Sequence, residues 1–268
     1  MNILLEKMHS IADPSQVAGL SRFFKTGPGQ YGEGDRFLGI KVPATRQVVK
    51  ECWRKVGPEE LEECIASDYH EVRLAALLAL VELFRHAGRK HLLKRKTMAG
   101  RENVPEPADV SYTATDGLSQ EECVRFYLSH TDRINNWDLV DLSCYPLLGE
   151  WLLDKDRSLL YGLARNGRTI WEQRIGIVST MTFIRHGQTA DTFAIADILL
   201  HHPHDLIQKA VGWLLREAGK RDKNVLTAYV KGHTPEDDTP RYLTMPRTML
   251  RYAIEKFPEQ ERRNYLCR

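Results

Sequence analysis

The sequence predicts an all-α fold. Apolar residues recur at the three- and four-residue spacing of amphipathic helices along almost the whole chain, whereas the alternating pattern of strands is nearly absent. Prolines and glycines stand at positions typical of helix starts and ends. The chain has 268 residues, of which 42% are hydrophobic and 28% charged, so it can bury a sizeable core. We therefore expect one helical domain over residues 1–268.

Prolines and glycines divide the helical pattern into segments. Pro43 and Pro58 suit the first turn of a helix, because proline lacks an N–H and its φ is already helical. Gly88, Gly167 and Gly219 suit helix ends, where glycine tolerates a left-handed conformation. The predicted helices are residues 2–11, 14–25, 43–56, 58–67, 69–87, 118–131, 136–153, 155–165, 169–187, 190–201, 204–220, 222–231 and 244–256.

Two segments interrupt this pattern. Residues 26–42 (TGPGQYGEGDRFLGIKV) are rich in glycine and contain Tyr31 and Phe37, and residues 100–117 contain two prolines. Long irregular segments are unusual in a compact domain and are often functional. We expect irregular loops at both places, and the first is the stronger functional candidate.

A weak internal repeat relates three apolar helical segments, EVRLAALLAL from Glu71, EQRIGIVSTM from Glu172 and IQKAVGWLLR from Ile207. Their starting points are 101 and 35 residues apart, close to three units and one unit of about 34 residues, the length of helical-hairpin repeats. The aligned basic positions are Arg73, Arg174 and Lys209. The repeat predicts a stacked helical-hairpin solenoid, an α-α superhelix with a basic concave surface that suits an extended partner.

The composition favours a cytoplasmic protein with reduced thiols. The first residues, MNILLEKMHS, carry charges where a signal peptide needs an unbroken apolar stretch, and no apolar run is long enough to span a membrane. The five cysteines are scattered without a C-x-x-C pair, so we expect buried thiols rather than disulfides. The net charge of +2 is too small to indicate a nucleic-acid partner by itself.

The segment INNWDLVDLSCY, residues 134–145, carries the first candidate site. Trp137 and Asp141 are four residues apart, so a helix presents the indole and the carboxylate on one face. Together these groups suit a cation, which the ring attracts through its negative face and the carboxylate through its charge. The alternative is that Trp137 packs in the core while Asp141 pairs with a neighbouring arginine or caps a helix.

Two further residues on apolar helices are candidates for contact with a ligand. Arg174, three residues after Trp171, suits bidentate binding of a phosphate, and its alternative role is a salt bridge between helices. Trp213 follows Gly212, which would let another group approach closely. The alternative for Trp213 is ordinary core packing, as for most tryptophans at apolar helical spacing.

Basic residues gather in two places, which fits contacts to phosphates. The cluster between residues 85 and 101 includes Lys94 and Arg95, and the cluster near the C-terminus includes Arg247. The alternative for both clusters is a solvated helix face. Other chemistries lack support: the sequence holds no zinc-protease, nucleotide-loop, nucleophile-elbow or dinucleotide motif. The histidines around Pro203 cannot share one regular helix face, so we expect no metal site.

Five segments together resemble the AlkD-like DNA alkylation repair proteins, a family of HEAT-like repeat DNA glycosylases. They are FFKTGPGQYGEGDRFLGIKVP, INNWDLVDLS, WEQRIGIVSTM, IQKAVGWLLRE and MPRTMLRYAIEKF, and they cover nearly the whole chain. Members of the family release 3- and 7-alkylated purines from DNA, use no cofactor, and do not flip the base into a tight pocket. The sequence departs from the short members in its longer glycine-rich loop and in the stretch at residues 100–117.

The resemblance implies a role for each candidate residue. Asp141 would be the catalytic carboxylate, with Trp137 and Trp213 contacting the sugar and backbone at the lesion. Arg174 would hold a phosphate, Tyr31 would be an N-terminal contact to DNA, and the basic clusters would add backbone contacts.

These roles predict a monofunctional alkylpurine DNA glycosylase that acts as a monomer on double-stranded DNA, without a membrane or an obligate protein partner. One alternative is a non-catalytic protein that binds damaged or branched DNA by shape and charge. A second alternative is a scaffold for protein partners, which an apolar concave face would favour.

Overall fold

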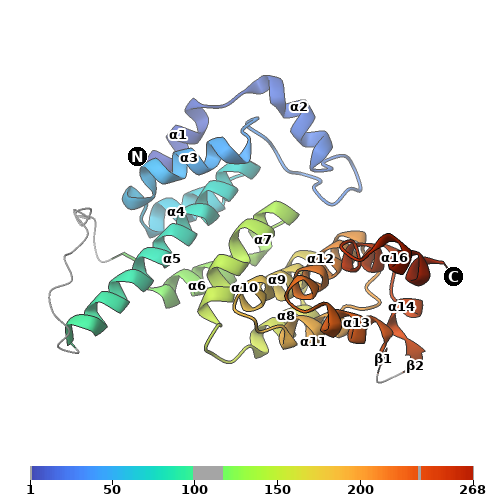
Figure 1. Cartoon of the computed structure of the whole chain (residues 1–268). Helices are drawn as coiled ribbons and strands as arrows, with labels where there is room; N and C mark the ends of the chain where they lie inside the picture. Colours follow the sequence, from blue (N-terminus) through green and yellow to red (C-terminus); the bar gives the residue numbers. More distant parts are fainter. Residues whose placement is uncertain (1, 99–116, 235–236, 268) are drawn as a thin grey trace. The chain divides into compact units, whose positions relative to one another are not determined.

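The computed structural model describes residues 2–98, 117–234 and 237–267, except the side chains of residues 90–98, 234 and 237. Its fold is all-α, as the sequence predicts (Figure 1). Within the described residues, the exception is a short antiparallel hairpin of β1 (His233–Thr234) and β2 (Asp237–Pro240). These strands are too short to show an alternating pattern, so the sequence analysis did not predict them.

The chain forms two compact units, Met1–Leu139 and Val140–Arg268. The boundary falls inside helix α7 (Trp137–Cys144), so the same helix begins in one unit and ends in the other. None of the helices in the described part of the chain combines the length and the hydropathy that a bilayer crossing requires. The cysteines are free; four of them are buried, as expected, whereas Cys267 is exposed.

The first unit is built around one long helix. Its elements before α7 are α1 (Ile3–Ser10), α2 (Pro14–Phe23), α3 (Val42–Cys52), η1 (Trp53–Lys55), α4 (Pro58–Ile65), α5 (His70–Met98), α6 (Gln120–Ser129) and η2 (Thr131–Arg133). Helix α5 packs against α1, α3, α4 and α6. Every residue from His70 to Val81 is buried, because neighbours surround this part of the helix on all sides.

Helix α5 corrects one predicted boundary. The sequence analysis placed a helix end at Gly88, but α5 continues through this residue to Met98. A Cβ atom at Gly88 would lie 2.7 Å from the side-chain nitrogen of Gln120. The glycine therefore lies inside α5, beside the Gln120 side chain of α6, and does not terminate a helix.

The second unit contains the rest of α7 and shorter helices. They are η3 (Tyr145–Gly149, a π-helical turn), α8 (Ser158–Asn166), α9 (Ile170–Val178), α10 (Thr180–Arg185), α11 (Ala190–Ile198), α12 (Asp205–Arg221), α13 (Lys223–Lys231), α14 (Arg241–Thr244), α15 (Arg247–Ala253) and α16 (Glu259–Leu266). Helix α12 packs against α9, α13 and α15, and α8 packs against α9. Gly167 follows α8 as its C-cap, as predicted, whereas Gly219 lies within the last turn of α12.

The structure divides two helices that the sequence analysis predicted as continuous. Residues 136–153 form α7 and the π-helical turn that contains Pro146, since proline cannot donate the regular helical hydrogen bond. Residues 169–187 form α9 and α10 with a break at Ser179, whose hydroxyl donates to the Ile175 carbonyl oxygen at 2.7 Å. Helix α16 was not predicted, because only Tyr265 among its residues is buried and no apolar stripe marks it.

The glycine-rich segment 26–41 runs without a helix from the end of α2 to the start of α3. Gly39 has φ of +88°, and a Cβ atom there would lie 1.9 Å from the carbonyl oxygen of Asp13, so only glycine fits. The other predicted loop, residues 100–117, lies outside the described residues except for Gly117.

Candidate functional site

Helix α7 carries Trp137 and Asp141, four residues apart as predicted. The side-chain oxygen of Asn136 accepts a hydrogen bond from the Trp137 N–H at 2.9 Å, so it satisfies one of the free N–H donors at the start of the helix. Trp137 and Asp141 are both half-buried, which leaves part of each side chain accessible to a ligand.

Trp137 lies against aromatic side chains of the first unit. Its indole stacks on Phe24 with ring centroids 5.5 Å apart, and Phe23 approaches it edge-on at 5.8 Å. Phe23 is 61% exposed. Trp137 thus takes part in packing, as the alternative interpretation expects, but it does so at the edge of an accessible aromatic surface and not in a closed core.

Behind this aromatic surface lies a buried histidine between two carboxylates. The Nδ1 atom of His70 is 3.1 Å from Asp35, and its Nε2 atom is 2.9 Å from Asp138. Burial alone lowers the pKa of His70, but the hydrogen bonds and negative charges of Asp138 and Asp35 outweigh it and raise the pKa to about 9. The imidazole is therefore a cation at neutral pH.

Arg73 completes the buried cluster. Its guanidinium donates to Asp35 at 2.6 Å, to the side-chain oxygen of Asn135 at 3.0 Å and to the Ser67 carbonyl oxygen at 2.8 Å. Burial acts to raise the pKa of Asp35, but the bond from His70 and the charge of Arg73 hold it below its usual range. The two cations of the cluster thus balance the two aspartates.

The same stretch of α5 holds the glycine-rich segment through Glu71. This buried carboxylate accepts hydrogen bonds from the backbone N–H groups of Leu38, Gly39 and Ile40 at 3.0, 2.9 and 3.1 Å. Together with Asp35, these bonds fix the second half of the segment on α5.

In the second unit, Asp141 and Arg174 form a bidentate ion pair. The Nε atom of Arg174 lies 2.8 Å from one carboxylate oxygen and its Nη2 atom lies 2.7 Å from the other, while Nη1 donates to the Leu206 carbonyl oxygen. Arg174 is buried, and the Asp141 side chain is 15% exposed. This geometry corresponds to the salt bridge between helices that the sequence analysis gave as the alternative role of Arg174.

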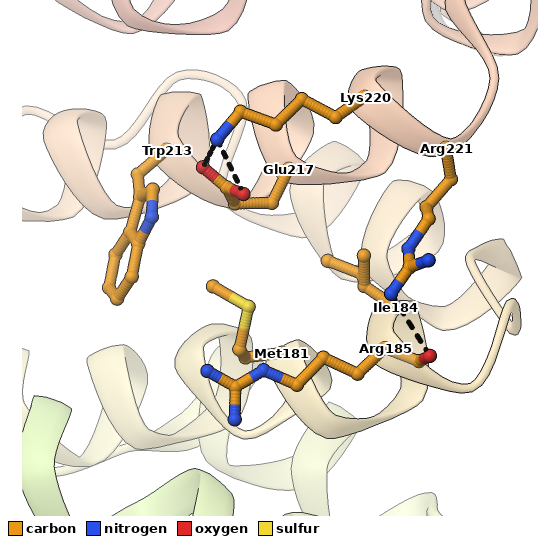
Figure 2. A pocket seen from close by; sticks show the side chains of 7 residues that line it. All are labelled: Met181, Ile184, Arg185, Trp213, Glu217, Lys220 and Arg221. Atoms are coloured by element: carbon orange, nitrogen blue, oxygen red, sulfur yellow. Dashed lines mark hydrogen bonds and ion pairs between the residues drawn. The ribbon is translucent and has the colours of Figure 1, made fainter.

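Trp213 lines a pocket of about 480 Å³ in the second unit (Figure 2). The other lining residues come from α10 and α12: Met181, Ile184, Arg185, Glu217, Lys220 and Arg221. Trp213 is half-buried, so it is not a core tryptophan. Asp141 and Arg174 are not among the residues that line this pocket.

The remaining predicted contacts are dispersed along the chain. Tyr31 is half-buried in the glycine-rich segment, and Arg247 is half-buried at the first position of α15. Lys94 and Arg95 belong to α5, but their side chains lie outside the described residues.

Two of the histidines around Pro203, His202 and His204, have structural partners. His202 pairs through Nε2 with the Gln173 side-chain oxygen at 3.0 Å, and His204 is the N-cap of α12, where its Nδ1 atom accepts from the Leu206 N–H at 3.2 Å. In the part of the chain that the structure describes, no group of His, Cys, Asp and Glu side chains is arranged to hold a metal ion.

Sequence reasoning missed the buried cluster and the cations of the pocket. His70 and Asp35 are 35 residues apart, and no local spacing marks them as partners. Arg185 ends α10 and Arg221 follows Lys220 at the end of α12, outside the two basic clusters. The basic last turn of each helix is the one signal that could have drawn attention to them.

Comparisons with known proteins agree with the fold. The structure is similar to a solved structure from Enterococcus faecalis described as a predicted DNA alkylation repair enzyme, with a TM-score of 0.63 over 92% of this chain and 97% of that chain. The two sequences are 15% identical, so this similarity concerns the fold alone. No curated protein matches the sequence. The family model described as DNA alkylation repair enzyme matches residues 4–257, and the chain therefore belongs to that family.

Proposed function

We propose that the protein is a monofunctional DNA glycosylase that removes cationic 3- and 7-alkylated purines from duplex DNA. The observation that carries this proposal is Asp141, a partly exposed carboxylate whose two oxygens are fixed by Arg174. It lies on the same helix as Trp137, whose ring belongs to an accessible aromatic surface. Family membership supports a role in alkylation repair.

The chemistry requires little from the protein beyond electrostatics. When the N-glycosidic bond breaks, its electron pair passes to the base, which leaves as a neutral purine, and positive charge develops on the deoxyribose. A preorganised carboxylate stabilises that charge, and water then adds to C1′ and loses a proton. In the proposal Asp141 provides the carboxylate and orients the water, since Arg174 prevents rotation of its side chain.

The remaining candidates hold the DNA. Trp137 and Trp213 contact the sugar and backbone at the lesion and favour cationic bases through their ring faces. Lys94, Arg95 and Arg247 contact phosphates, and Tyr31 is an N-terminal contact to the DNA. Arg174 contacts a phosphate through Nη1 in place of its bond to the Leu206 carbonyl oxygen, so its two bonds to Asp141 remain. The enzyme acts as a cytoplasmic monomer and needs water as its only co-substrate.

The test is the release of free base from a duplex that contains a single 7-methylguanine, under single-turnover conditions. We expect Asp141→Asn to slow release by about 10²–10³-fold, the usual effect of removing one electrostatic group from an active site. The matched control is Asp154→Asn, which neutralises an exposed carboxylate of the same unit. Circular dichroism of both variants verifies folding, because Asp141 is a partner of a buried arginine.

One observation favours a second candidate, a non-catalytic protein that binds damaged or branched DNA. Both oxygens of Asp141 accept from Arg174, which is also the arrangement of a purely structural ion pair. In this case wild type and Asp141→Asn both bind the duplex in a salt-sensitive way, and neither releases base.

A further inference from the structure

The pocket of the second unit that contains Trp213 combines an apolar wall with uncompensated cations (Figure 2). Met181, Ile184 and Trp213 supply the apolar surface. Three cationic side chains line the pocket against one carboxylate, Glu217, so the lining carries two excess positive charges. This combination suits an anion attached to an apolar group.

The single carboxylate of the pocket is already neutralised. Glu217 accepts from Lys220 with both oxygens, at 2.8 and 2.9 Å, and from Arg216 at 3.2 Å. Repulsion of an incoming anion is therefore weak, and the two excess charges belong to Arg185 and Arg221.

The guanidinium of Arg185 is oriented by an aromatic ring and keeps its N–H donors unused. Its guanidinium lies over the ring of Tyr145, 4.6 Å from the centroid, which fixes the plane of the group but occupies none of its N–H donors. Among the described residues the guanidinium has no hydrogen-bond or ion-pair partner. In Figure 2 it points toward the side of the pocket where Trp213 lies. A fixed guanidinium with free donors is suited to bidentate binding of a phosphate.

Arg221 lies at the other end of the pocket in the same view (Figure 2). One of its nitrogens donates to the carbonyl oxygen of Arg185, the last residue of α10, at 3.1 Å. This bond anchors the side chain, and the described residues provide no carboxylate partner for it. The two arginines thus line one pocket, and each presents N–H donors that no described residue uses.

We propose that this pocket binds one phosphodiester of the DNA backbone through Arg185 and Arg221, with the attached deoxyribose against Trp213. The pocket volume lies within the range of sites for small organic groups, and a strand of duplex DNA offers the phosphate next to an apolar sugar face. The inference rests on the proposed function for its partner, but neither Arg185 nor Arg221 has a part in the chemistry.

The test compares binding of an undamaged 20-base-pair duplex by wild type and by Arg185→Ala/Arg221→Ala, across a salt titration. We expect binding at about 0.1 M salt to weaken about tenfold or more, as for the loss of a charged hydrogen bond. The slope of log K against log salt becomes less steep by about 0.9, the contribution of one phosphate. Tyr145→Ala gives a smaller loss than the double variant, and Tyr145→Phe keeps the ring and binds like wild type.

The matched control is Lys50→Ala/Arg125→Ala, which removes the same charge from exposed positions of the first unit. An equal change of slope in this control overturns the proposal, because it attributes the effect to net charge. An unchanged slope in the pocket variant also overturns it. The proposal is also overturned if deoxyguanosine monophosphate binds wild type at micromolar concentration and loses this binding in the pocket variant, while it leaves duplex binding by wild type unchanged. The pocket would then belong to a free nucleotide.

Base release distinguishes this inference from the proposed function. If wild type releases no 7-methylguanine while the pocket variant still shows the reduced slope, the phosphodiester site stands and the glycosylase proposal fails. If wild type releases base and the pocket variant binds DNA with the wild-type slope, the glycosylase proposal stands and the pocket inference fails.

Discussion

At the scale of single residues, the first unit contains a buried charge cluster whose members depend on one another. His70 is bonded to Asp35 and Asp138, and Arg73 shares Asp35 with Asn135. Removing water from charges is costly, and such a cluster is stable only when each charge keeps its partners. Breaking it at one residue leaves an uncompensated buried charge.

We expect His70→Gln to destabilise the protein in a manner that depends on pH. The folded-state pKa of about 9 is higher than the ordinary value of 6.5, so the stabilisation from protonated His70 is fully present below pH 6.5. It is lost as the pH rises through 9. The difference in unfolding free energy between wild type and variant should therefore shrink by about 3 kcal/mol between pH 6 and pH 10.

Urea unfolding at a series of pH values measures this difference. His130→Gln is the matched control, because His130 pairs with Glu62 at a more exposed position. A difference between wild type and His70→Gln that stays constant with pH would mean that His70 is neutral in the folded protein.

For the candidate site, the sequence predicted which residues share a helix but not which residues pair between helices. That Trp137 and Asp141 share a helix follows from their spacing alone, and the structure confirms this. The partner of Asp141 is Arg174, 33 residues later, and the sequence analysis had named an arginine only as one of several alternatives. The internal repeat did indicate equivalent positions for paired arginines. Two of its aligned basic residues, Arg73 and Arg174, are both buried, and each pairs with an aspartate.

At the scale of elements, glycines determine how closely helices of the second unit pack. A Cβ atom at Gly212 of α12 would lie 2.5 Å from the Met249 carbonyl oxygen and 2.5 Å from Cβ of Tyr252 on α15. The neighbours are backbone and a Cβ atom, which cannot move aside as a flexible side chain can. The contact between α12 and α15 therefore requires glycine.

We expect Gly212→Ala to destabilise the protein by about 1–3 kcal/mol through overpacking, which lowers the Tm by a few degrees. Gly162→Ala is the matched control, since Gly162 of α8 has open space where the Cβ atom would lie. Its higher helix propensity should leave the Tm equal or slightly raised. Thermal unfolding followed by circular dichroism gives both values, and equal Tm values for the two variants would mean that α15 moves away without cost.

Element boundaries were predicted well where the signal is local. Pro43 and Pro58 lie in the first turns of α3 and α4, as expected from proline chemistry. Gly88 was misinterpreted because a glycine that ends a helix and a glycine inside a helix, beside a side chain of a neighbouring helix, look alike in a sequence. The difference depends on Gln120, which is distant in the chain.

At the scale of the whole molecule, the two compact units are joined inside α7, between Leu139 and Val140. No linker separates them, and both residues at the boundary are buried. Unfolding of one unit alone would therefore break a helix in its middle and expose its apolar residues. The single domain stays a prediction, and we propose that the chain unfolds cooperatively.

We expect thermal unfolding to show one transition, with the same midpoint by circular dichroism at 222 nm and by tryptophan fluorescence. The fluorescence signal comes from both units, since Trp53 and Trp137 belong to the first and Trp213 belongs to the second. Two separate midpoints, or a calorimetric enthalpy well above the van't Hoff enthalpy, would show instead that the units are independent domains.

The superhelical arrangement and its basic concave surface stay predictions. They concern the whole molecule, and the salt dependence of DNA binding tests the electrostatic part of them. A slope that corresponds to several phosphates is expected for a long basic surface, whereas a slope near zero would favour a scaffold for protein partners.

The sequence by itself determined the fold class, most helices, the family and the placement of Trp137 with Asp141 on one helix. These depend on residues within about one or two helical turns of each other, or on motifs that persist along the chain. The tertiary structure alone decided which charges are buried together, which glycines contact a neighbouring helix, and where Arg185 and Arg221 line one pocket. The physical reason is that these contacts join residues separated by some thirty or more positions, whose proximity is set by packing and leaves no periodic trace in the sequence.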